Sequence, residues 1–152
     1  MAVLAGFVAI PAVLAGCAEP GYPSFGLALA RSADGQLTLL GTTCSGSLST
    51  IELGSGLDWW ADAETTITPT AETSGEFHVD LPEVGAQFEV SPVPSAEPVA
   101  PMFVRVTSSD GVRVQAFEEL PAPGDALFIL PGEDAPVVHD LGDFQVAGYC
   151  DA

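Results

Sequence analysis

From residue 26 to the end of the chain, short runs of apolar or alternating residues are separated by turn-forming Gly, Pro, Ser and Asp. The clearest alternation lies in residues 76–81, where Phe77, Val79 and Leu81 share one face and His78 lies on the solvent-facing side. Between residue 26 and the end of the chain there are roughly ten such runs, at intervals of about 8–12 residues. None of them carries apolar residues at helical spacing over three turns. The pattern predicts an all-β fold, specifically an antiparallel β-sandwich.

Turn residues set the bounds of the predicted strands. Asp110-Gly111 joins residues 102–107 to residues 112–117 in the best-defined hairpin, and residues 87–90 are expected to pair with residues 76–81. The proline-rich segment 92–101 lacks the N–H donors of an interior strand, so we expect it to cross between sheets. The expected strands are 26–30, 36–44, 48–53, 57–61, 65–70, 76–81, 87–90, 102–107, 112–117, 126–130 and 144–150.

Residues 2–16 form an uncharged, mostly apolar stretch that ends in Leu14-Ala15-Gly16-Cys17. A stretch of about 15 residues is shorter than the roughly 20 that span a bilayer, but it has the length of the apolar region of a secretory signal peptide. With Cys directly after two small residues, this motif resembles the lipobox of bacterial membrane lipoproteins. The resemblance implies that residues 1–16 are a signal peptide and that Cys17 carries a diacylglyceryl thioether as the mature N-terminus.

The same resemblance divides the rest of the chain into two parts. Residues 17–25, which contain Pro20, Gly21 and Pro23, form a short lipidated tether, and residues 26–152 form the sandwich domain. The first residues lack the Lys or Arg that normally begins a signal peptide. The alternative is therefore that residues 2–16 are a buried helix or an uncleaved anchor and that Cys17 is an ordinary thiol.

The number of cysteines agrees with export. If Cys17 carries lipid, Cys44 and Cys150 remain as an even pair, which favours a disulfide in an oxidising compartment. Two unpaired thiols are the alternative. The order Cys44, Trp60, Cys150 only faintly follows that of immunoglobulin domains, because the cysteines lie too far apart. The predicted sandwich is thus immunoglobulin-like only in the loose sense.

The chain is strongly acidic: 21 Asp and Glu face only three basic side chains, and the formal net charge is −18. The basic residues are Arg31, Arg105 and Arg113, and the absence of Lys excludes phosphate-binding P-loops and Schiff-base enzymes. Such a field repels nucleic acids and anionic lipid headgroups, so a membrane would hold the domain through lipid alone. A solvated acidic surface is the default interpretation, and a cationic envelope partner or a divalent cation is the alternative.

Two stretches contain residues that suit ligand binding. In the acidic stretch 132–143, carboxylates and an imidazole provide the oxygen and nitrogen ligands of a divalent cation, although the spacing fits no known motif. The candidate ligands are Glu133, Asp134, His139, Asp140 and Asp143, but a solvated loop without a metal is the default interpretation of this stretch. Adjacent Trp59 and Trp60 would point to opposite faces of a strand, so one ring is available to stack on a sugar or a partner protein.

No pattern of catalytic residues stands out, and no cofactor is expected. The sequence therefore predicts a non-enzymatic, lipid-anchored interaction or envelope module on the extracytoplasmic face of the cell membrane. A metal- or ligand-binding carrier and a carboxylate-dependent envelope hydrolase are the alternatives. An enzyme would require acidic residues that converge in a cleft, whereas a module would carry them spread over its surface.

Overall fold

A computed structural model describes residues 26–58, 60–130, 133–146 and 149–150. The expected signal peptide, the tether with Cys17, and Trp59 lie outside these residues. The described chain is mostly β, with antiparallel pairing throughout, as the sequence predicted. Its elements are β1 (Leu27–Arg31), β2 (Leu37–Ser55), β3 (Thr65–Pro69), β4 (Ser74–Leu81), β5 (Phe88–Ser91), β6 (Met102–Ser108), β7 (Gly111–Phe117), β8 (Ala126–Phe128), β9 (Val137–His139) and α1 (Leu141–Val146).

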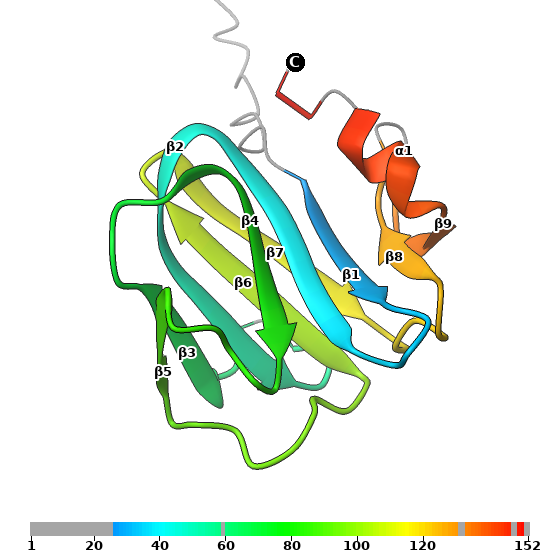
Figure 1. The fold of residues 1–152 in the computed structure, drawn as a ribbon, viewed down its shortest axis with the longest axis horizontal. Coiled ribbons are helices and arrows are strands. Elements are labelled where there is room, and N and C mark those ends of the chain that lie inside the picture. Colours follow the sequence, from blue (N-terminus) through cyan, green and yellow to red (C-terminus); the bar gives the residue numbers. More distant parts are fainter. Residues whose placement is uncertain (1–25, 59, 131–132, 147–148, 151–152) are drawn as a thin grey trace, which may run out of the picture.

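The 19-residue strand β2 connects all the other strands (Figure 1). Its first half pairs with β1 and β4, and β1 continues the sheet to β8 and β9. Its second half pairs with β3 and β6, which continue to β5 and β7 respectively. The strands thus form two groups that share β2, which arches over from one group to the other in Figure 1.

A bulge in β2 produces this arch. The pairing with β4 shifts between Thr42 and Ser47, and Cys44 within the shift has a φ of 55°, in the left-handed region. Thr43 is buried, and its hydroxyl donates to the carbonyl of Gly46 at 2.6 Å and accepts from the N–H of Gly75 at 3.0 Å. The Thr43 side chain therefore satisfies backbone groups that the interrupted ladder leaves without a strand partner.

The main core draws on both groups of strands. Alternate residues of β2 enter it on either side of the bulge, and they meet apolar side chains from every other strand except β9. Gly41 and Gly54 lie on β2 opposite Phe77 and Phe103, whose rings occupy the space that a Cβ atom would take. The core residues are Leu27, Leu29, Leu37, Leu39, Leu48, Ile51, Leu53, Ile67, Phe77, Val79, Leu81, Phe88, Met102, Val104, Val106, Phe117 and Leu127.

A second, smaller apolar cluster lies on the other face of β1 and β8. Ala28 and Ala30 of β1 and Phe128 of β8 are buried there against Phe144 of α1, and Ala126, Leu40, Leu130 and Tyr149 complete the cluster. The small alanine side chains leave room for the aromatic rings that the C-terminal segment supplies. This segment therefore covers the outside of the sheet beside β8 and β9, as Figure 1 shows for α1.

The molecule has two ends along the strand direction. At the disulfide end, hydrogen bonds connect Thr42 to Gly26 and Ser109 to Ser47. At the opposite end, which we call the Arg31 end, the Arg31 side chain donates to the carbonyls of Pro121 and Gly35. There the N–H of Gly56 also donates to the carbonyl of Pro101, and the Gln36 amide to that of Leu81.

Several predicted elements were wrong in detail. Residues 36–44 and 48–53 belong to one strand, and the described residues within 57–61 form bends and a turn instead of a strand. Strand β5 pairs with β3 and not with the strand at 76–81, so segment 92–101 connects two strands of the same group.

The C-terminal part also differs from the expectation. The predicted last strand, 144–150, begins within helix α1, and the acidic stretch expected to be a loop contains β9. Asp140 explains the start of the helix, because its carboxylate accepts the N–H of Gly142 at 2.8 Å.

Candidate functional site

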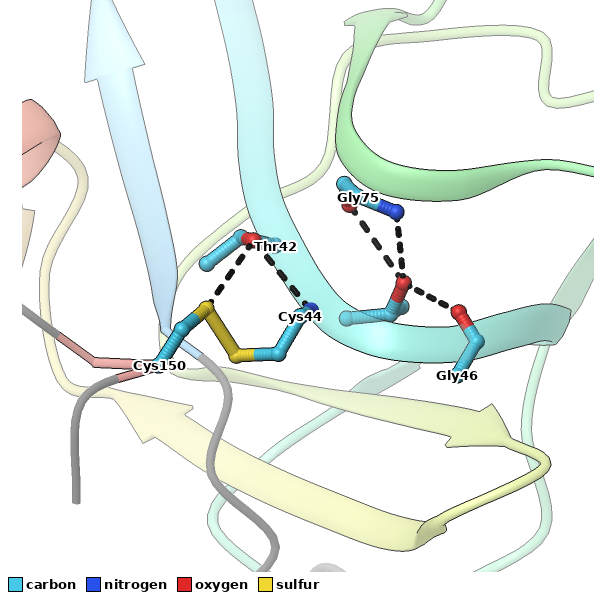
Figure 2. Close-up of a disulfide and its surroundings, with 6 residues drawn as sticks. Thr42, Cys44, Gly46, Gly75 and Cys150 are labelled. Carbon is cyan, nitrogen blue, oxygen red and sulfur yellow. Dashed lines mark hydrogen bonds between the residues drawn. A yellow bond between two sulfur atoms is a disulfide. The ribbon is translucent and has the colours of Figure 1, made fainter.

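A disulfide connects Cys44 in the bulge of β2 to Cys150, as predicted, with 5.3 Å between their Cα atoms (Figure 2). The Thr42 hydroxyl lies 3.7 Å from the Cys150 sulfur and accepts the Cys44 N–H at 3.4 Å. The bond joins the last described residues to the middle of β2 over a sequence separation of 106 residues. It therefore fixes the C-terminal segment at the end of the molecule where β1 begins.

Aromatic contacts hold the same segment against the sheet. The ring of Phe144 lies 5.3 Å from that of Phe128 and 5.2 Å from that of Tyr149. The Tyr149 hydroxyl donates to the carbonyl of Ile129 at 2.8 Å, and its ring lies against Gly26, where no side chain competes for the space. Burial raises the pKa of Tyr149. These contacts assign a structural role to the C-terminal aromatics.

Two of the candidate metal ligands bind each other. The Oε2 atom of Glu133 lies 2.9 Å from Nε2 of His139 and accepts the N–H of Leu130 at 2.8 Å. The Leu130 N–H, followed by His139, holds the pKa of Glu133 below its usual value. The His139 ring also stacks on Phe128, with 4.7 Å between centroids. Both side chains thus join the end of β8 to β9.

The other three candidate ligands do not join them. Asp140 caps α1, Asp143 lies in the first turn of that helix, and Asp134 is exposed in the turn before β9. A carboxylate in the first helical turn interacts favourably with the helix dipole, which gives Asp143 a structural role. Among the described residues, no group of three or more His, Cys, Asp or Glu side chains is arranged to hold a metal ion.

Trp60 lies in the loop between β2 and β3, at the Arg31 end. Trp60 is 77% exposed, and its backbone N–H donates to the carboxylate of Asp58 in a local turn. Trp59 lies outside the described residues. Leu57 of the same loop and Val99 of segment 92–101 are also exposed. Exposed apolar side chains thus gather on loops of this end, away from the disulfide.

Segment 92–101 also borders a hollow of about 450 Å³ beside β5. Most of its lining residues have apolar side chains, polar groups also face it, and the carboxylate of Glu83 is the charged group among them. The lining residues are Pro82, Glu83, Val84, Phe88, Val90, Val93, Pro94 and Ser95. The sequence analysis missed this hollow because it assigned β5 to the wrong partner; the prolines on both sides of β5 were the available signal.

A smaller hollow of about 230 Å³ separates α1 from the outer face of β2 and β4. Leu40, Leu141 and Phe144 provide apolar walls, and Glu76 and His78 of β4 provide the polar ones. His78 is exposed, as predicted. One carboxylate and one imidazole on the same face of a strand do not make the convergent acidic cleft that a hydrolase would require.

All three arginines interact within the described fold. Arg31 pairs with Glu97 at 2.7 Å, and Arg105 pairs with Glu52 at 2.7 Å. The hydrogen bond from Arg105 lowers the pKa of Glu52, and Arg113 lies close enough to Tyr149 to affect its pKa. The three arginines thus neutralise the charge of only a few of the 21 acidic residues.

In the part of the chain that the structure describes, no helix has the length and apolar character of a membrane span. Comparison of the chain with protein-family models, with curated proteins and with solved structures finds no match.

Proposed function

We propose that this protein is a lipid-anchored β-sandwich on the extracytoplasmic face of the cell membrane, where it serves as a non-enzymatic interaction or envelope module. The Cys44–Cys150 disulfide carries the proposal, because such bonds form and persist mainly in oxidising compartments outside the cytoplasm. With these two cysteines joined, Cys17 is the remaining thiol of the chain and occupies the lipobox-like position. Two acyl chains on that residue provide stable anchoring where a single chain is marginal.

The shared core supports the sandwich architecture. Core side chains from β1 and β8 belong to the same cluster as those from β3, β5, β6 and β7. The buried amide of Gln115 on β7 donates to the carbonyl of Leu27 on β1 at 3.2 Å, which connects the two groups of strands directly. We therefore propose that the groups pack face to face as two sheets, with β2 passing from one to the other.

An anchor at Cys17 would orient the domain. The tether, residues 17–25, leads to Gly26, whose carbonyl accepts the N–H of Thr42 at the disulfide end. The Arg31 end, with exposed Trp60 and Leu57, would then point away from the membrane. Contiguous exposed apolar patches mark interaction surfaces, and Trp60 and Leu57, both exposed on one loop, are the residues that would contribute to one here.

The test of the proposal is Cys17→Ser in the full-length chain expressed in a bacterium that processes lipoproteins. We expect the parent to sediment with membranes and to take up labelled fatty acid, whereas the variant does neither and keeps residues 1–16. Cys44→Ser with Cys150→Ser is the matched control, because it removes cysteines but should keep the label. A Cys17→Ser variant that is processed and membrane-bound like the parent would exclude the anchor.

A further inference from the structure

Strand β5 has one free edge. Among the described strands it pairs only with β3, through Thr66↔Ser91 to Pro69↔Phe88. Next to this ladder the N–H of Thr70 donates to the carbonyl of Gln87, so these two opposite residues form a hydrogen-bonded pair. Hydrogen-bonded and non-hydrogen-bonded pairs alternate along an antiparallel ladder, so this bond determines which residues of β5 direct their backbone groups toward β3.

In this alternation Gln87, Glu89 and Ser91 face β3, and Phe88 and Val90 turn their backbone groups outward. The outward N–H of Phe88 bonds to the nearby carbonyl of Gly85. The N–H and C=O of Val90 and the C=O of Phe88 therefore remain as a short row of donors and acceptors at the edge. Such a row is a template on which another extended chain can add as a strand.

The hollow of about 450 Å³ lies beside the same residues. Phe88 and Val90 line it from β5, and residues 82–84 and 93–95 enclose it from the segments before and after the strand. Residues that exchange hydrogen bonds across a ladder point to the same face, so those opposite Val90 in an added strand would project toward this hollow. Val93, which is 78% exposed, would become covered.

Charge decides between the possible occupants of this edge. Glu83 lines the hollow and Glu89 is exposed on the opposite face of β5, so carboxylates border the edge on both sides. A second copy of the chain would bring its own formal charge of −18 and be repelled. A Lys- or Arg-bearing segment would instead pair with these carboxylates and be attracted by the field of the whole domain.

We propose that the free edge of β5 and the adjoining hollow bind an extended, cationic segment of a partner protein by antiparallel strand addition. Backbone hydrogen bonds to Val90 fix the segment, apolar side chains enter the hollow, and basic side chains meet Glu89 on the other face. This proposal rests on the proposed role of the protein as an interaction module and specifies the surface and the chemistry of the partner.

The probe is an acetylated heptapeptide amide of alternating Lys and Val, titrated against the full-length, disulfide-bonded chain in neutral detergent micelles. In antiparallel strand addition the Val opposite Val90 exchanges hydrogen bonds with it, and every Val turns its N–H toward β5, so N-methylation of every Val should weaken binding at least tenfold. N-methylation of every Lys blocks only the outward-facing amides and should leave the affinity within about twofold. Equal affinity of both methylated peptides, or no binding of the parent peptide, overturns the proposal.

Protein variants test the surface itself. Ser95→Trp, which fills the exposed side of the hollow, should weaken binding tenfold, and Ala71→Trp in an exposed turn at the disulfide end should not. Glu83→Gln with Glu89→Gln should weaken binding more than Glu118→Gln with Glu119→Gln, which removes the same charge from an exposed loop elsewhere. Equal losses in the two double variants would show that only net charge matters and would contradict a defined site.

Hydrogen exchange gives a direct readout. Peptide binding should slow exchange of the Val90 amide and leave the amides of β4, another edge strand, unchanged. Protection of β4 instead of β5 would overturn the proposal. These results are independent of the anchor: a failed peptide test leaves the lipidation of Cys17 standing, and a membrane-bound Cys17→Ser variant leaves the binding result standing.

Discussion

Removal of the Cys44–Cys150 disulfide should strongly destabilise the domain. The bond closes a loop with a sequence separation of 106 residues, and in the chain-entropy description such a loop contributes about 4–5 kcal/mol by restricting the unfolded chain. Domains of this size have unfolding free energies of about 5–15 kcal/mol, so the loss is a large fraction of the total. We expect the double variant Cys44→Ala with Cys150→Ala to fold, because the buried residues of the main core stay unchanged and Cys44 only packs against them from the border.

The assay is urea unfolding followed by far-UV circular dichroism of the β-sheet, with parent and double variant compared at equal pH and ionic strength. The free energy of unfolding should fall by about 4–5 kcal/mol, which corresponds in a thermal scan to a melting temperature lower by about 10–20 °C. A second variant, Cys44→Gly with Cys150→Ala, should recover about 1 kcal/mol, because residue 44 has a φ of 55° that Gly adopts without strain. A loss below about 1 kcal/mol on removal of the disulfide would refute the reasoning from loop closure.

Three further changes should have defined effects. Gly41→Ala would place a methyl group against the Phe77 ring and should cost about 1–3 kcal/mol in urea unfolding; strict additivity with Phe77→Leu would contradict this contact. Arg105 lowers the pKa of folded Glu52, so this pair stabilises the fold above about pH 4 and loses its contribution as pH falls through the folded pKa. The stability difference between the parent and Glu52→Gln should therefore shrink on acidification, and a pH-independent difference would exclude the pair as its cause. NaCl should raise the melting temperature of a chain with net charge −18, and CaCl₂ at equal ionic strength should do the same, whereas a saturable calcium-specific increase would reveal a metal site.

The strand content was predictable because alternation directly reports burial on one face. Phe77, Val79 and Leu81 are buried and His78 is exposed, as the period of two requires. The continuity of β2 was not predictable, because the Ser- and Gly-containing bulge has the composition of a turn. Only the tertiary contacts of Thr43 with Gly46 and Gly75 show that the chain stays in a ladder there.

The C-terminal helix escaped prediction because a helix of six residues is too short to show a repeating pattern. The disulfide was predicted from the even pair of cysteines that remains if Cys17 carries lipid, and from the oxidising compartment that export implies. The candidate binding surface beside β5 was missed because it depends on which strand pairs with β5, and pairing between distant strands is set by the core as a whole. The contact between Glu133 and His139 in the acidic stretch was not predicted, because composition shows which residue types are present but not which of them bind each other.

The central claim is that this chain is held at the membrane by lipid on Cys17, with its domain closed by Cys44 and Cys150. Mass spectrometry of the membrane-extracted protein, digested without reduction, tests this claim most directly. The account predicts an N-terminal peptide that begins at Cys17 with a diacylglyceryl thioether, together with a disulfide-joined pair of peptides. An unmodified Cys17 within an intact N-terminal peptide, or free thiols at Cys44 and Cys150, would contradict it.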